Sequence, residues 1–65
     1  MKITLNAEPR DIAAPSLAEA LAELGFDSPA IATAVNGTFI PRDARATTRL
    51  ADGDRLEVLA PMQGG

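Results

Sequence analysis

The sequence predicts an α+β domain in which a mixed sheet of four to five strands is covered on one face by one main helix. Three observations lead to this prediction. Segments near the two ends, "KITL" and "RLEVLA", alternate polar and apolar residues as half-buried strands do. Between them, "SLAEALAELGF" has the apolar spacing of a helix, and "AVNGTFI" has the form of a β-hairpin.

The chain is expected to begin with a hairpin. In "KITL", Ile3 and Leu5 lie on one face of a strand. Asn6 and Pro9 are interpreted as turn residues, after which residues 10–12 return as a short edge strand. Pro9 is tolerated in this region because an edge strand leaves one row of its backbone groups unpaired.

The helix is predicted to begin after Ser16 and to end at Gly25. Ser16 and Glu19 form a capping box, in which the hydroxyl accepts from the Glu19 amide and the carboxylate accepts from the Ser16 amide. Gly25 adopts the left-handed backbone angle, and Phe26 folds back as the apolar contact of a Schellman motif. The apolar residues of the helix form one stripe that faces the core, namely Leu17, Ala20, Leu21 and Leu24.

The segment "AIATAVNGTFI" is expected to form a second hairpin. Asn36 and Gly37 favour a type I′ turn, whose twist matches that of the strands on either side. The strands are placed at residues 31–35 and, more briefly, at 39–40. Pro41 then ends the regular pairing, because proline cannot donate a ladder hydrogen bond.

The rest of the chain is predicted to return to the sheet. A loop over residues 43–48 precedes Leu50, which is expected in the core. Asp52-Gly53-Asp54 is interpreted as a tight turn, since the remaining ligands of a calcium loop are missing. The final strand directs alternate residues to the core, namely Leu56, Val58 and Ala60. With the first and last strands side by side, this order of elements is the β-grasp (ubiquitin-like) arrangement.

Composition narrows the possible functions. The 65 residues carry a formal charge of -3 and include two aromatic residues, so nucleic acid is not an expected partner. The sequence has no Cys and no His, which removes the thiolate nucleophile, the usual general base and sulfur-ligated metals. We therefore do not expect an enzyme, and we assign no catalytic residue and no metal ligand.

The charge and hydropathy patterns also bear on location. No apolar run approaches the length that crosses a bilayer, and "MKITLNAEPR" lacks the apolar core of a secretory signal. A cytoplasmic protein with no membrane partner is expected. Acidic residues interleave with four arginines, which are interpreted as part of a solvated mixed-charge face: Arg42, Arg45, Arg49 and Arg55.

The sequence closes with "PMQGG", whose last two residues carry no side chain. We divide the chain into one domain at residues 1–60 and a flexible carboxyl-terminal tail at 61–65. A bare end suits a function in which the terminal carboxylate itself reacts, since a Cβ near the carbonyl hinders attack and restricts the backbone. Gly65 is the candidate reactive residue, and Gly64 lets the tail thread into a narrow enzyme site.

The ordered motifs of the second half resemble those of the ThiS family, the sulfur carriers of thiamin biosynthesis. The resemblance spans the whole chain. It rests on a Val-Asn hairpin, an Ile-Pro-Arg step, a Leu-x-Asp-Gly-Asp turn and a terminal Gly-Gly. These positions are Val35, Asn36, Ile40, Pro41, Arg42, Leu50, Asp52, Gly53, Asp54, Gly64 and Gly65. Two positions depart from the family pattern: Ala7, where Gly is frequent, and Met62, where Val is frequent.

The resemblance implies a carrier protein with no enzymatic activity of its own. An E1-like adenylyltransferase (ThiF-like) would join the Gly65 carboxylate to AMP, and the ATP would be bound by that enzyme. A sulfur donor protein would convert the adenylate to a thiocarboxylate, which would deliver sulfur to thiazole synthase (ThiG-like). No cofactor is expected on the chain itself. The partners would dock on the folded body, where Leu59 faces outward and Phe39 joins it if Ile40 points inward.

Several alternatives stay open at this point. Phe39 belongs to the core, and Leu59 is an isolated surface residue, if the predicted register is wrong. The small subunit of molybdopterin synthase is also a β-grasp thiocarboxylate carrier, but this chain is short for it. A TGS-like module has a similar Val-Asn-Gly hairpin and Asp-Gly-Asp turn, and it binds partners without sulfur chemistry.

Overall fold

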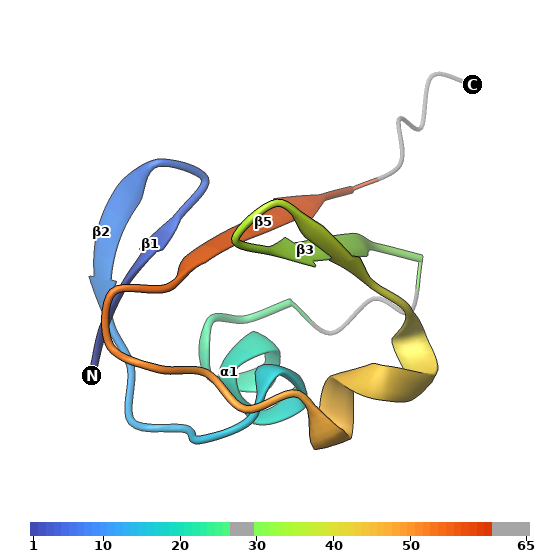
Figure 1. The fold of residues 1–65 in the computed structure, drawn as a ribbon, viewed down its shortest axis with the longest axis horizontal. Coiled ribbons are helices and arrows are strands. Elements are labelled where there is room, and N and C mark those ends of the chain that lie inside the picture. Colours follow the sequence, from blue (N-terminus) through green and yellow to red (C-terminus); the bar gives the residue numbers. More distant parts are fainter. Residues whose placement is uncertain (27–29, 61–65) are drawn as a thin grey trace.

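The computed structural model describes residues 1–26 and 30–60, which form a five-stranded mixed sheet with helices on one face (Figure 1). The strands are β1 (Lys2–Leu5), β2 (Glu8–Asp11), β3 (Ala32–Val35), β4 (Thr38–Ile40) and β5 (Arg55–Leu59). They follow the order β2-β1-β5-β3-β4 in the sheet. β1 and β5 run parallel, and the other neighbouring strands are antiparallel. The predicted fold class is therefore confirmed.

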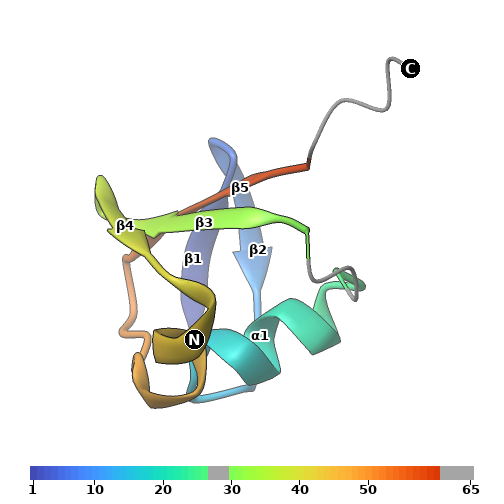
Figure 2. The ribbon, with the colours of Figure 1, turned by 90° about the vertical axis from the view of Figure 1, so that its right-hand side faces the viewer.

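Helix α1 (Leu17–Glu23) connects the two hairpins and lies on the same side of the sheet as the 3-10 helix η1 (Arg42–Thr47), as Figure 2 shows. Ser16 caps α1, and its hydroxyl accepts from the Glu19 amide at 3.2 Å. The other half of the predicted capping box is wrong. The Glu19 carboxylate instead accepts from the Ser16 hydroxyl at 2.8 Å, because this hydroxyl already lies beside Glu19, from whose amide it accepts. Within the described ranges, no helix has the length and apolar character of a transmembrane segment.

The end of α1 confirms the predicted Schellman motif. Gly25 has a φ of 91°, and its amide donates to the Ala22 carbonyl at 3.2 Å. The Phe26 amide donates to the Leu21 carbonyl at 2.8 Å, which gives the second hydrogen bond of the motif. Phe26 packs against the core, and so does Leu24, which is half-buried rather than buried.

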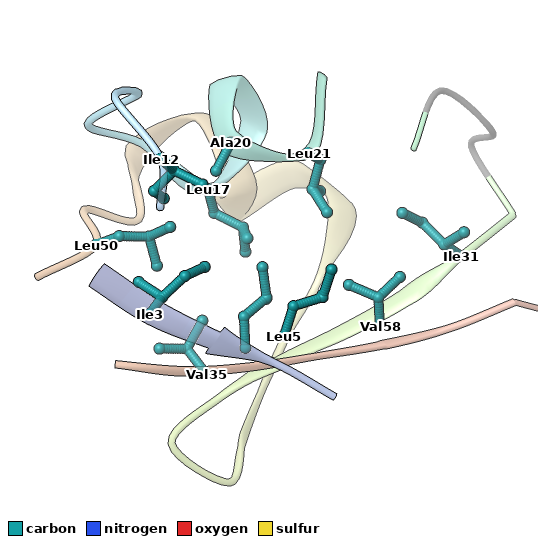
Figure 3. Close-up of a cluster of buried hydrophobic side chains, with 11 residues drawn as sticks. Ile3, Leu5, Ile12, Leu17, Ala20, Leu21, Ile31, Val35, Leu50 and Val58 are labelled. Atoms are coloured by element: carbon teal, nitrogen blue, oxygen red, sulfur yellow. The ribbon is translucent and has the colours of Figure 1, made fainter. Parts of the chain in front are cut away.

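Apolar side chains from the helix and the sheet meet in one core. Leu17, Ala20 and Leu21 of α1 point toward Ile3 and Leu5 of β1 (Figure 3). Burial of such side chains is the main source of stability in a domain of this size. The other buried apolar residues are Ile12, Ile31, Val35, Leu50, Leu56 and Val58.

The first hairpin is tighter than predicted. Asn6 and Ala7 form a two-residue turn with φ values of 48° and 72°, and the main chain then enters β2 at once. Pro9 therefore lies within the edge strand, opposite Thr4, and not in the turn. Ile12 follows the strand instead of ending it. The reason is that Asn tolerates a left-handed backbone, so two residues are enough to reverse the chain.

The second hairpin and the last strand are close to prediction. Asn36 and Gly37 have φ values of 51° and 83°, as a type I′ turn requires. Ala60 was expected on the inner face of the last strand, but it lies beyond β5 and is exposed. The pairing ends one residue earlier, because Ala32, the first residue of β3, lies opposite Leu59.

Residues 42–47 form η1, where a loop was predicted over residues 43–48. The Ala44 amide donates to the Pro41 carbonyl at 2.9 Å, a contact of the three-residue spacing that defines this helix. The Thr48 hydroxyl donates to the Ala44 carbonyl at 2.7 Å and helps to end it. A 3-10 helix of this length leaves no clear periodic pattern of apolar residues in a sequence.

Candidate functional site

The sheet face turned away from α1 contains a depression of about 180 Å³ over β3, β4 and β5. Its lining includes Leu59, Phe39 and two alanines of β3. Ala32 lies opposite Leu59, and Ala34 lies between Phe39 of β4 and Glu57 of β5. Because alternate strand residues share one face, the small alanines leave a hollow between the two large apolar side chains.

Leu59 and Phe39, the predicted docking residues, are both strongly exposed. The exposed fraction is 70% for Leu59 and 63% for Phe39, whereas Ile40 packs against the core. The alternative in which Phe39 belongs to the core is therefore wrong. Two large apolar side chains facing solvent beside one hollow form a surface suited to a partner with an apolar side chain. A docking role for these residues stays a prediction.

Gly64 and Gly65, predicted as the threading and reactive residues, lie outside the described residues. The structure describes the end of β5, from which the chain continues to these two residues. Leu59 ends β5 and lines the depression, and Gly65 follows Leu59 by six positions in the sequence. Six residues span at most about 20 Å. An enzyme bound over the depression is therefore within reach of the Gly65 carboxyl group.

Asn6, which sequence reasoning assigned only to a turn, contacts the last strand. Its side-chain nitrogen donates to the Val58 carbonyl at 3.1 Å, and its side-chain oxygen accepts from the Val58 amide at 2.9 Å. Asn6 also lines the depression. The sequence shows an Asn in a short turn but does not show its hydrogen-bond partner. That partner lies 52 positions away and is brought to Asn6 by the pairing of β1 with β5.

Arg45 corrects the prediction of a solvated mixed-charge face. Its side chain is buried, with 9% exposed, whereas the other three arginines of that group are exposed. Arg45 Nη2 donates to the Ile31 carbonyl at 2.6 Å, and Nε donates to the Thr33 hydroxyl at 3.3 Å. The Thr33 hydroxyl donates to the Ile40 carbonyl at 3.0 Å. A guanidinium is tolerated in the interior when its donors are satisfied, and here it ties η1 to β3.

The carboxylates near the beginning of β5 accept hydrogen bonds from the protein itself. Asp52 accepts from the Lys2 amide at 2.7 Å, and Asp54 accepts from the Asn36 side chain at 3.0 Å. Gly53 between them has a φ of 91°, so the interpretation as a turn is confirmed. Among residues 1–26 and 30–60, no three or more His, Cys, Asp or Glu side chains are grouped so that they could hold a metal ion.

Proteins similar in sequence to this chain include a sulfur carrier and a thiazole synthase. A family model described as the ThiS family matches residues 3–65. The sulfur carrier protein ThiS of Thermus thermophilus is 36% identical over 63 residues, which cover 97% of this chain and 98% of that protein. A thiazole synthase of Paramagnetospirillum magneticum is 39% identical over 66 residues. This match covers 100% of the chain but 20% of the length of that synthase.

Solved structures similar to this chain have the same fold over its full length. The crystal structure of the thiamine biosynthesis protein ThiS from Geobacter metallireducens superposes with a TM-score of 0.84 at 29% identity, and both chains are covered completely. A solution structure of a thiamine biosynthesis protein from the same organism gives a TM-score of 0.81 at 29% identity. It covers 100% of this chain and 88% of the other.

Proposed function

Because the chain belongs to the ThiS family, we propose that it is a sulfur carrier of thiamine biosynthesis whose working group is the Gly65 carboxylate. The observation that carries this proposal is the family match through residue 65, the position where the chemistry is placed. Identity to a sulfur carrier over nearly the whole of both proteins supports it. The chain acts as the substrate of an adenylating enzyme and does not catalyse the reaction itself.

The first step activates the carboxylate. At neutral pH the Gly65 carboxylate is anionic, so it is a poor electrophile but a nucleophile toward phosphorus. An E1-like, ThiF-like adenylyltransferase binds ATP, a carboxylate oxygen bonds to the α-phosphorus, and pyrophosphate leaves. The product is a mixed anhydride with AMP, whose carbonyl carbon is open to attack. No cofactor is held by the carrier in this step.

The second step exchanges oxygen for sulfur. Sulfide supplied by a sulfur donor protein attacks the adenylated carbonyl, the bond to AMP breaks, and a thiocarboxylate remains on Gly65. Because Gly64 and Gly65 have no Cβ, nothing beside the carbonyl obstructs the approach of the sulfur nucleophile or widens the tail. The sulfur is carried on the main chain, which fits a sequence without Cys.

Thiazole synthase is the acceptor of the sulfur in this proposal. A segment similar to the whole of this chain makes up a fifth of the Paramagnetospirillum magneticum thiazole synthase, which supports a direct association between carrier and synthase. Both the synthase and the adenylating enzyme are assigned to the depression beside Leu59 and Phe39, from which the tail is within reach. We propose a cytoplasmic location, where ATP is available to the adenylating enzyme.

Intact-protein mass spectrometry tests this function. The chain is incubated with ATP, its cognate adenylating enzyme and a sulfide source, and we expect the mass to rise by the difference between one sulfur and one oxygen atom. Omission of ATP should abolish the gain. An unchanged mass, with an enzyme that does modify another ThiS protein, would contradict the proposal and favour a binding module without sulfur chemistry.

A further inference from the structure

Two asparagines in corresponding turn positions hold β5 near its opposite ends. Asn6 and Asn36 are each the first residue of a two-residue hairpin turn, with φ values of 48° and 51°. The Asn36 side-chain oxygen accepts from the Arg55 amide at 2.9 Å, where β5 begins. The Asn6 side chain bonds both the amide and the carbonyl of Val58, close to the end of the strand. One asparagine therefore lies close to the tail, and the other lies far from it.

Asn6 completes the pairing of β5 where β1 no longer lies beside it. The parallel pairing with β1 covers Arg55 and Leu56, and the Asn6 amide extends it with a 2.9 Å bond to the Leu56 carbonyl. The main chain then turns into β2, which lies on the far side of β1. On the opposite edge, β3 pairs with β5 as far as Leu59. The end of β5 is thus held by a strand on one edge and by the Asn6 side chain on the other.

The end of β5 leads directly to the proposed reactive group. Without the contacts of Asn6, Val58 and Leu59 would be held along one edge, so their local opening would cost less free energy. An opened strand end has no fixed direction, and Leu59 would also move relative to the depression. A displacement of about 1 Å can slow a positioned reaction by roughly 100-fold. The orientation of this short segment therefore matters for the chemistry of Gly65.

Resting on the function proposed above, we infer that Asn6 is a positioning residue for the adenylation of Gly65. Its side chain keeps Val58 within the sheet, so the tail of a docked carrier leaves the folded body at one fixed place. Asn6 acts through β5 and does not touch the reacting atoms. Its contribution should accordingly appear in kcat, whereas the contribution of a docking residue such as Leu59 should appear in KM.

The variant Asn6→Gly tests this inference, with Asn36→Gly as a matched control. Each removes an Asn side chain from a turn position with positive φ, which Gly adopts without strain. Asn6→Gly also removes two side-chain hydrogen bonds to β5, and Asn36→Gly removes one to β5 and one to Asp54. Adenylation kinetics are measured with the carrier as the varied substrate, at a temperature where melting curves show both variants folded. We expect Asn6→Gly to lower kcat about tenfold or more with a smaller change in KM, and Asn36→Gly to keep kcat within about twofold.

Amide hydrogen exchange of the isolated variants gives a second measurement. The Val58 and Leu59 amides should exchange faster in Asn6→Gly than in Asn36→Gly, because only the former loses its contacts at this end of the strand. Asn6→Asp keeps an acceptor for the Val58 amide but has no donor for the Val58 carbonyl, so an intermediate kcat is expected. This variant replaces Asn6→Gly if the glycine variant does not fold.

The outcomes separate this inference from the proposed function. Equal kcat values for the two glycine variants, a change confined to KM, or equal exchange at Val58 and Leu59 would overturn the positioning role and leave the sulfur-carrier function standing. A wild-type chain that is not adenylated by an active enzyme would overturn the proposed function, and the inference with it.

Discussion

The side-chain nitrogen of Asn36 donates a hydrogen bond to a carboxylate oxygen of Asp54, 3.0 Å away. The other carboxylate oxygen of Asp54 accepts from the Ala51 amide at 2.7 Å. This contact joins the Asn-Gly hairpin turn to the Asp-Gly-Asp turn, although the two residues are 18 positions apart in the sequence. The two motifs therefore form one structural unit at the beginning of β5.

Asp54→Ala is expected to lower the free energy of unfolding by about 1–2 kcal/mol, because it leaves the Ala51 amide and the Asn36 side chain without their acceptor. Asp43→Ala removes an equal charge from an exposed position of η1 and should change stability by less than about 0.5 kcal/mol. Urea denaturation followed by circular dichroism measures both variants. Equal losses of stability in the two variants would show that removal of a negative charge, and not loss of the hydrogen bonds to Asp54, causes the effect.

Ala7→Gly is expected to stabilise the domain by up to about 1 kcal/mol, because Ala is strained in the left-handed region and Gly is not. Ala7 has a φ of 72°. The same substitution at Ala22, an exposed position of α1, should destabilise by about 1 kcal/mol. Thermal melting tests whether the two substitutions shift the melting temperature in opposite directions. A lower melting temperature for Ala7→Gly would contradict the strain argument.

Arg45→Lys should destabilise the protein although it preserves the charge. The single ammonium nitrogen of lysine cannot occupy the positions of both Nε and Nη2, which contact the Thr33 hydroxyl and the Ile31 carbonyl, so we expect a loss of about 1–3 kcal/mol. Arg42→Lys, at an exposed position, should stay within about 0.5 kcal/mol of the wild type. Urea denaturation curves give both values. Similar stability of the two variants would mean that the buried contacts of Arg45 contribute little.

Gly65→Ala should slow adenylation by about tenfold or more, because a Cβ beside the carbonyl obstructs the positioning of the terminal carboxylate in a narrow enzyme site. Its melting temperature should stay close to that of the wild type, since a chain end contributes little to stability. Gln63→Ala changes the tail without adding a Cβ and should keep the wild-type rate. The initial rate of mass gain measures all three proteins. Equal rates would refute the requirement for a bare terminal residue.

Leu59→Asp should raise the dissociation constant for the adenylating enzyme about tenfold or more, because it removes apolar contact and adds a charge that must lose water on binding. Ala46→Asp adds the same charge to an exposed position of η1, on the helical side of the sheet, and should leave the affinity unchanged. Isothermal titration calorimetry compares the two. An unaltered constant for Leu59→Asp would remove this residue from the interface.

Sequence reasoning succeeded where neighbouring residues decide the structure. The Schellman end of α1 follows from Gly25 and Phe26, whose backbone hydrogen bonds reach back three and five positions. The outward orientation of Leu59 follows from alternation in a strand. It failed for Arg45, since a side chain that looks solvated in sequence is buried where it reaches Ile31 and Thr33.

By itself, the sequence determined which segments become strands and the main helix, where that helix begins and ends, and which terminal residues lack side chains, because these properties depend on local backbone preference and periodicity. The tertiary structure alone decided which distant groups meet. It placed Asn6 beside Val58 and set two alanines between Phe39 and Leu59. The physical reason is that strand order and register are fixed by burial of the whole core, which no single segment contains.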